Sequence, residues 1–211
     1  MAHIPPESSK QKQGDAKTWA DESYGDLIST LPRRGGWANP LVLYQNYWLN
    51  PRRLKHIIPV KHHFKPRRDD VILATYPKCG TTWLKALAFA ITTRSRHAFA
   101  VAGHPLLTGR HPQEAVPHLE VPNPAAADLA GIEELPSPRL LATHLPLSLL
   151  PPAVSACGCR VVYLCRQPKD ALVSWWHFSN SMHKGPSSIT LDDALSMFCE
   201  GFSPFGRQRD G

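Results

Sequence analysis

The segment Tyr76–Trp83 combines residue types that can bind a phosphate group. Lys78 supplies a positive charge, and Thr81 and Thr82 supply hydroxyl donors. Gly80 lets the backbone come close to an anion, because it carries no side chain. Together these residues predict an anion-binding loop.

The residues on either side of this loop predict the elements that position it. The run 71–76 is short, apolar and rich in β-branched residues, which is typical of a buried strand. Apolar residues then recur at helical spacing from Trp83 to Ile91. A helix that begins straight after a strand presents unpaired amides and a partial positive charge, which attract phosphate.

Two other interpretations of the loop stay open on this pattern. A capped helix after a strand needs no ligand. A kinase-like phosphate binder is the weaker alternative, because the motif G-x-x-x-x-G-K-[ST] places its lysine after the last glycine, whereas Lys78 precedes Gly80.

The rest of the chain alternates apolar runs with helical ones. This alternation predicts an α/β fold, with a central parallel sheet covered by helices on both sides and the phosphate-binding loop at the carboxyl ends of the strands. A long irregular crossover with a short helix near 125–134 is expected between the first two strands. Further strands are expected at 140–143 and 160–165, the latter apolar on both faces, and helices at 168–181 and 191–199.

The part of the chain before residue 70 carries weaker signals. Residues 1–35 are expected to form a flexible polar leader. Residues 51–68 are basic, and Pro51 and Pro66 are expected to break any long element. Four aromatic residues between these segments either cover the edge of the core or line an apolar pocket, and the sequence favours neither. They are Trp37, Tyr44, Tyr47 and Trp48.

The composition excludes several classes of protein. The chain has 211 residues and 42% of them are apolar, which is enough for a core and argues against disorder. Apolar stretches fall far short of the ~20 residues of a membrane helix, and Met1–Lys10 lacks the apolar region of a secretory signal. We therefore expect a cytoplasmic protein without a membrane span.

The net charge favours an anionic ligand. Lys and Arg number 24 against 17 Asp and Glu, which gives a formal charge of +7 at pH 7. A positive charge also attracts nucleic acid, but no RNA-binding signature, finger spacing or basic heptad region accompanies it. We expect no nucleic-acid partner.

The five cysteines are expected to be reduced thiols, because an odd count without a secretory signal argues against a disulfide framework. Cys157 and Cys159 lie close together but lack a second Cys or His pair at zinc spacing, so no metal is expected. Five histidines without a distinctive context are expected in loops or on the surface: His62, His63, His104, His111 and His118.

Three segments, in the same order, resemble segments of the cytosolic sulfotransferases, and the lead Gly36–Trp48 resembles plant members, of flavonol or steroid type, in particular. Tyr76–Trp83 resembles the phosphosulfate-binding loop, with Cys79 where serine is frequent. Ala142–Pro146 resembles the strand end that carries the family's catalytic histidine. Arg166–Phe178 resembles the segment that grips the 3′-phosphate of the cofactor.

The resemblance implies transfer of a sulfuryl group from 3′-phosphoadenosine 5′-phosphosulfate (PAPS) to a hydroxyl of a small phenolic, flavonoid or steroid-like acceptor, without a metal. It makes His144 the general base, for which a histidine that merely caps a strand end is the alternative. It also implies that Lys78 stabilises the charge that develops on the leaving phosphate oxygen.

The resemblance assigns the other site residues to the cofactor. Amides and hydroxyls at Gly80, Thr81 and Thr82 would hold the 5′-phosphate, with Lys78 and Cys79 also in the cofactor site, and Trp83 would face the adenine ring. The 3′-phosphate would bind Arg166 and Ser174.

Two features depart from the family's pattern. Many members have a basic residue two positions before the histidine, where this chain has Ala142. The sulfotransferase domain is expected over 36–206, with 207–211 a divergent tail, whereas the family continues well past this point. We therefore expect a C-terminally truncated form whose turnover is weak or absent. The alternative function is to bind full-length relatives as a partner that is catalytically weak or inactive. The formation of a homo-oligomer stays open.

Overall fold

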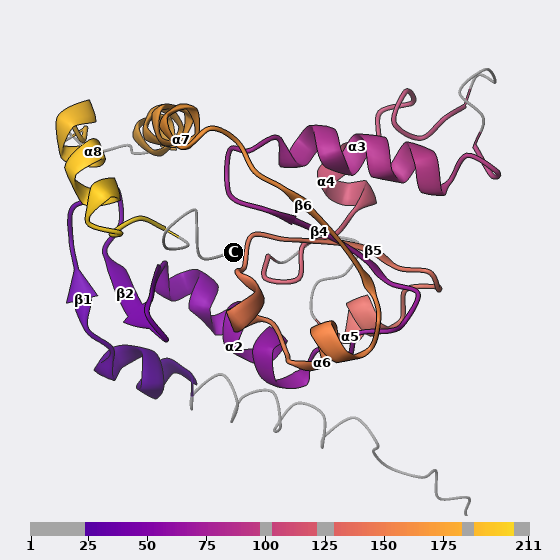
Figure 1. Cartoon of the computed structure of the whole chain (residues 1–211), viewed down its shortest axis with the longest axis horizontal. Helices are drawn as coiled ribbons and strands as arrows, with labels where there is room; N and C mark the ends of the chain where they lie inside the picture. The colour runs from indigo at the N-terminus through magenta and orange to yellow at the C-terminus, as the bar shows by residue number, and fades with distance from the viewer. Residues whose placement is uncertain (1–23, 98–102, 122–128, 183–187, 205–211) are drawn as a thin grey trace, which may run out of the picture.

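A computed structural model describes residues 24–97, 103–121, 129–182 and 188–204 (Figure 1). Its centre is a parallel sheet in the order β5-β4-β6, formed by Leu140–Thr143, Val71–Thr75 and Arg160–Leu164. Val71 of β4 lies level with Leu140 on one side and with Arg160 on the other. The expected α/β fold with a parallel sheet is confirmed.

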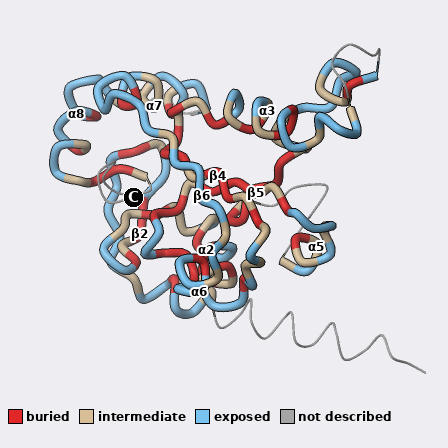
Figure 2. The backbone as a smooth tube through the Cα atoms, turned by 45° about the vertical axis from the view of Figure 1, so that its right-hand side comes forward, coloured by how far each residue is buried: buried red, intermediate tan, exposed pale blue. Residues whose placement is uncertain are grey.

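Helices cover both faces of the sheet at its central strand, as the alternating side chains of β4 require. Ile72 packs into a core cluster with residues of α2 (Pro51–His63), whereas Leu73 packs against Phe89 of α3 (Thr81–Thr92). Figure 1 shows α3 above the sheet and α2 below it, and Figure 2 shows that β4 and β5 are largely buried. The other helical elements are α4 (Pro112–Ala115), α5 (Leu129–Glu133), η1 (Leu147–Leu149), α6 (Ala153–Ala156), α7 (Pro168–Met182) and α8 (Leu191–Cys199).

Strand β6 departs from the expectation that it is buried. Val161, Val162 and Tyr163 are 46%, 42% and 47% exposed. Because successive side chains of a strand point to opposite faces, both faces of β6 are open. In the described part of the chain β6 pairs with β4 alone, so it is an edge of the sheet.

The part of the leader that the structure describes belongs to the fold. Residues 24–30 are helical, and Ile28 is buried in the main core cluster. Strands β1 (Arg33–Arg34), β2 (Leu41–Tyr44) and β3 (Tyr47–Leu49) then form a small antiparallel sheet. The end of the expected leader, residues 24–35, therefore contains a helix and strand β1. Residues 1–23 and the tail 207–211 lie outside the described residues.

Helix α2 contradicts the expected break at Pro51. Pro51 begins this helix, where a proline is tolerated because the first amides have no partner inside the helix. The side chain of Asn50 caps it by accepting a bond of 2.9 Å from the amide of Arg52. The helix ends at His63, before Pro66.

The crossover from α3 to β5 contains a short strand-like segment. The amide of Leu119 donates to the carbonyl of Ala142, and the amide of Ala142 donates to the carbonyl of Pro117, both at 2.9 Å. This pairing places residues 117–120 beside β5. The helix expected near 125–134 is confirmed as α5 from residue 129, and 125–128 lie outside the described residues.

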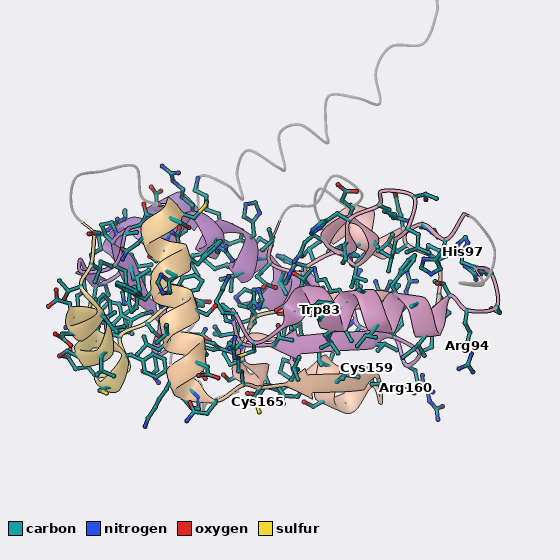
Figure 3. The ribbon with its side chains drawn as sticks, turned by 90° about the horizontal axis from the view of Figure 1, so that it is seen from above. Trp83, Arg94, His97, Cys159, Arg160 and Cys165 are labelled. Atoms are coloured by element: carbon teal, nitrogen blue, oxygen red, sulfur yellow. The ribbon has the colours of Figure 1, made fainter. Side chains whose placement is uncertain are left out.

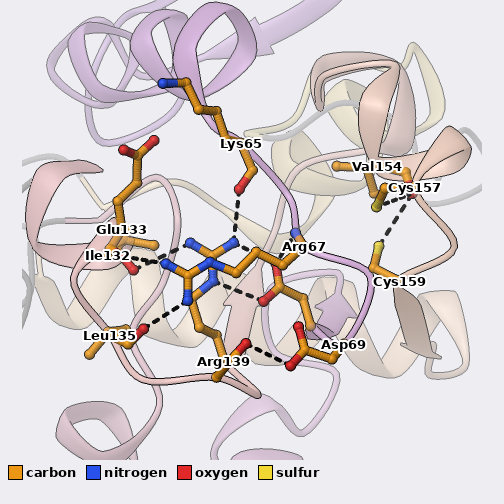
Figure 4. A network of polar contacts seen from close by, with 12 residues as sticks. Lys65, Arg67, Asp69, Ile132, Glu133, Leu135, Arg139, Val154, Cys157 and Cys159 are labelled. Carbon is orange, nitrogen blue, oxygen red and sulfur yellow. Dashed lines mark hydrogen bonds and ion pairs between the residues drawn. The ribbon is translucent and has the colours of Figure 1, made fainter.

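A buried ion pair fixes the beginnings of strands β4 and β5. Arg139 donates from Nε to Asp70 Oδ1 at 2.8 Å and from Nη2 to Asp70 Oδ2 at 2.6 Å. Both side chains are fully buried. Figure 4 shows Arg139 also reaching the carbonyl of Lys65, and Arg67 bonded nearby to the carbonyls of Glu133 and Leu135.

Among the described residues no helix is both long and apolar enough to span a membrane.

Candidate active site

The loop between β4 and α3 has the shape that an anion site needs. Gly80 has φ +104°, a conformation that residues with a side chain rarely adopt, and it immediately precedes α3. Lys78 also has a positive φ, +69°. The Thr81 and Thr75 hydroxyl oxygens lie 2.6 Å apart, which ties the start of the helix to the end of the strand.

The substitution Gly80→Ala is expected to lower the free energy of unfolding by about 1–2 kcal/mol, because an alanine at a positive φ is strained. Urea unfolding measures this change. Gly35→Ala is the matched control, since Gly35 has no neighbour within 4 Å of an added Cβ and no positive φ. Equal effects of the two substitutions would contradict the assignment of strain to the loop.

The loop forms one wall of a cavity of about 560 Å³ at the carboxyl ends of the strands. Eight of the nine predicted site residues line this cavity, although they come from three segments of the chain. They are Lys78, Gly80, Thr81, Thr82, Trp83, His144, Arg166 and Ser174. Trp83 is 78% exposed at the start of α3, where Figure 3 labels it.

Cys79 is the predicted site residue that does not line the cavity. It is 5% exposed and belongs to the main core cluster. Burial raises the pKa of its thiol above the usual value. The Cys79 side chain is therefore placed for packing under the loop, and not for contact with a ligand in the cavity.

The sequence missed four residues that line the same cavity: Arg53, Gln113, Trp175 and Phe178. Arg53 adds a third cation to the lining of this cavity, beside Lys78 and Arg166. The Lys78 ammonium lies 4.4 Å from the centre of the Phe178 ring, within the range of a cation–π contact. Only the basic run at 51–68 gave a signal for Arg53, and that run also fits an exposed basic face.

A buried lysine is linked to the start of α3 through Gln113. The Lys85 ammonium is fully buried in α3 and donates to the carbonyl of Val116 at 2.8 Å and to Gln113 Oε1 at 2.5 Å. Gln113 in turn donates from Nε2 to the Thr82 hydroxyl at 3.3 Å. Burial lowers the pKa of Lys85 to about 7, although the nearby Glu120 opposes this shift.

His144 lies at the end of β5, and its ring is held by the end of β4. Its Nδ1 lies 2.7 Å from the carbonyl oxygen of Thr75. A carbonyl can only accept, so Nδ1 carries the proton and Nε2 carries the lone pair. Burial, together with the nearby His118, lowers the pKa of His144 to about 4, so the ring is a neutral base at pH 7.

His104 and His118 lie in loops, which fits the expectation of loop or surface histidines, but both are buried, being 1% and 8% exposed, whereas His62, His63 and His111 are exposed. The ring centroids of His118 and His144 are 4.6 Å apart. The pairing of residues 117–120 with β5 creates this contact, which sequence spacing does not reveal.

Two apolar cavities adjoin the cation-lined one. His144 also lines a cavity of about 350 Å³ whose other walls include Leu145, Val154 and Tyr163. A smaller cavity of about 190 Å³ contains Trp37 and shares Arg53, Trp175 and Phe178 with the cation-lined cavity. Of the four early aromatic residues, Trp37 thus lines a cavity, whereas Tyr44 is buried in the core.

The arrangement combines three chemical capacities in one place. Lys78, Arg53 and Arg166 can neutralise an anion, the start of α3 can donate amides to it, and His144 can accept a proton where the cation-lined cavity meets an apolar one. No group of three or more His, Cys, Asp or Glu that could hold a metal occurs in the described ranges.

Comparison with known proteins shows which sequences and structures the chain is similar to. The sequence model described as "Sulfotransferase domain" matches residues 68–210. Cytosolic sulfotransferase 15 of Arabidopsis thaliana is 38% identical over 187 residues, which cover 87% of this chain and 52% of that protein. Cytosolic sulfotransferase 14 is 36% identical over 215 residues, covering 97% and 62%. The chain thus spans little more than half the length of these relatives.

Solved structures agree with the fold. A candidate steroid sulphotransferase of Arabidopsis thaliana superimposes with a TM-score of 0.74 at 33% identity, over 99% of this chain and 69% of that one. A mouse sulfotransferase in complex with PAP (3′-phosphoadenosine 5′-phosphate) gives a TM-score of 0.60 at 24% identity, over 81% of this chain and 55% of that one.

Proposed function

Because the chain belongs to the sulfotransferase family, we propose that it transfers the sulfuryl group of PAPS to a hydroxyl of a small acceptor. The observation that carries the proposal is the position of His144. It lines both a cavity with phosphate-binding character and an apolar cavity. A base at this junction can reach an acceptor hydroxyl and the transferred group together.

The residues of the cation-lined cavity fit PAPS. The two phosphate-bearing ends of PAPS need separate binding groups. Lys78 lies in the loop, whereas Arg166 lies just before α7 and Ser174 lies within that helix. Thr81 and Thr82 offer hydroxyls and amides at the start of α3. The exposed face of Trp83 suits stacking on the adenine ring.

PAPS supplies an activated sulfuryl group, and the residues of the chain supply position, charge and a base. Lys78 stabilises negative charge at the leaving phosphate oxygen. His144 Nε2 accepts the hydroxyl proton of the acceptor, while Nδ1–H stays bonded to the Thr75 carbonyl. The step therefore depends mainly on positioning and electrostatics, as in phosphoryl transfer.

The acceptor is a small, largely apolar molecule that carries a hydroxyl, such as a phenol, a flavonoid or a steroid-like alcohol. Support comes from the apolar walls beside His144 and from the aromatic side chains Trp37, Trp175 and Phe178. Rings of such an acceptor can pack on these walls while its hydroxyl remains near the base.

The pH profile follows from the lowered pKa of His144. Its pKa is about 4, below the usual 6.5, so the base stays unprotonated down to about pH 4. We expect the acid limb of the pH profile of kcat/KM near that value. The same shift affects stability: His144 takes up a proton at a higher pH in the unfolded chain than in the folded one, so its contribution to the free energy of unfolding falls as the pH drops from 6.5 towards 4. An acid limb near 6.5 would contradict this environment for the base.

Two measurements test the proposed function. Thermal melts with 3′-phosphoadenosine 5′-phosphate (PAP), and with ATP as control, report the donor site: at 100 times the dissociation constant a ligand adds about 2.7 kcal/mol, or roughly 5–10 °C. Incubation with PAPS and a panel of phenols, flavonoids and sterols, followed by mass spectrometry, reports transfer. A shift with PAP alone and a sulfated product support the proposal. A cooperative melt without a shift, and no product, refute it for this chain.

A second candidate function, binding to a longer relative without turnover, is favoured by the open edge strand β6. Its apolar residues Val161, Val162 and Tyr163 are exposed beside backbone groups that could pair with another strand. Co-purification with a full-length family member, weakened by Val162→Glu, would support this function. A monomer that captures no relative and turns over PAPS would exclude it.

A further inference from the structure

Glu120 is a buried carboxylate beside the site that the proposed transfer step does not use. Its side chain is fully buried, and it lines neither the cation-lined cavity nor the apolar cavity of His144. A buried charge is costly unless other groups compensate it, so its presence calls for a physical reason.

The backbone brings Glu120 to the end of β5. The segment 117–120 pairs with β5 through Leu119 and Ala142. Glu120 follows Leu119, and it contacts Thr143 and His144, the two residues that follow Ala142. This placement depends on the crossover and is not encoded by any local motif.

Both carboxylate oxygens of Glu120 hold the residues at this strand end. Oε1 accepts the backbone amide of His144 at 2.8 Å, and Oε2 accepts the Thr143 hydroxyl at 2.9 Å. The His144 ring is fixed on its other side by the Thr75 carbonyl. Glu120 and Thr75 thus hold His144 from two directions, through its peptide and through its ring.

Charged and titratable groups surround this pair. His118 Nδ1 lies 3.6 Å from Glu120 Oε1, slightly beyond hydrogen-bond distance, and Lys85 and Arg53 also act on the pair through space. Burial by itself would raise the pKa of Glu120. The neighbouring His118, and the charge and amide of His144, outweigh that effect and lower it to about 2. Glu120 is therefore ionised at neutral pH.

We propose that Glu120 is a positioning residue for the proton transfer: it fixes the peptide of His144 and stabilises the positive charge that the imidazole gains on taking the acceptor's proton. The proposal rests on the proposed function, in which His144 is the base. In this step the O–H bond of the acceptor breaks, the proton goes to Nε2, and the oxygen keeps the electron pair. The imidazolium then carries a charge that the nearby Glu120 carboxylate offsets, in addition to the bond from Nδ1 to the Thr75 carbonyl.

The test is the substitution Glu120→Gln, which keeps the shape of the side chain and removes its charge. We expect kcat to fall about 10- to 100-fold, and the pKa of His144, followed by the NMR titration of its ring protons, to fall below the wild-type value. The affinity for PAP should stay within about twofold, because Glu120 does not line the cation-lined cavity. Glu114→Gln is the matched control, since Glu114 is exposed on α4 and its removal should change none of these values.

The outcomes separate this proposal from the proposed function. A folded Glu120→Gln variant with unchanged kcat and unchanged His144 pKa overturns it. If the wild-type chain shows no transfer, the NMR titration still decides whether Glu120 controls the protonation of His144. If Glu120→Gln does not fold, Glu120→Asp decides: because the charge remains, the pKa of His144 should stay near the wild-type value, and a pKa that falls despite the retained charge would overturn the proposal.

Discussion

Replacing His144 with asparagine is expected to lower kcat for sulfuryl transfer by about 100- to 10,000-fold, the usual contribution of a general base. The asparagine amide can still donate to the Thr75 carbonyl, as Nδ1 of His144 does over 2.7 Å. It has no group that accepts a proton at the position of Nε2. The loss should therefore concern the transfer step, and steady-state kinetics with PAPS measure it.

The exposed histidine His62 supplies the control for this experiment. His62→Asn makes the same chemical change on α2, away from the cavities, and should leave kcat unchanged. Thermal melts with PAP should show that His144→Asn still binds the nucleotide. A His144→Asn variant with more than about a tenth of the wild-type kcat would show that another group takes the proton.

Removing one partner of the buried Arg139–Asp70 pair is expected to give the largest loss of stability. Arg139→Met leaves the Asp70 carboxylate buried without its cation, because both side chains are fully buried. Such a change costs about 3–5 kcal/mol, a large part of the ~5–15 kcal/mol that stabilises a typical domain. Urea unfolding at pH 7 measures the loss.

Two variants show that burial causes this loss. The double variant Arg139→Met with Asp70→Leu should recover much of the stability, because no unpaired charge remains. Glu200→Gln breaks the ion pair between Arg34 and Glu200, whose side chains are 44% and 49% exposed, respectively. This substitution should lower the free energy of unfolding by less than about 1 kcal/mol. A similar cost at the exposed and the buried pair would contradict the argument.

The sequence by itself predicted the elements whose signals are local. The strands β4, β5 and β6 and the helices α3, α7 and α8 follow from apolar runs and helical spacing within single segments. The loop of Lys78 and Gly80 was readable because its chemistry lies within eight consecutive residues, Tyr76–Trp83. Helix α2 was missed because Pro51 signals a break unless it is recognised as the first helical residue.

Only the tertiary structure decided which side chains face the site. Arg53 and Gln113 reach the cavity from α2 and α4, and no spacing in the sequence relates either of them to the loop. Glu120 and His118 meet His144 because the crossover pairs with β5.

The tertiary structure also decided which apolar residues are buried. Cys79 packs into the core although its neighbours Lys78 and Gly80 line the cavity, and β6 stays exposed although its residues are apolar. An apolar pattern in the sequence indicates that its residues favour burial. Whether another element covers that residue depends on contacts between segments far apart in the chain.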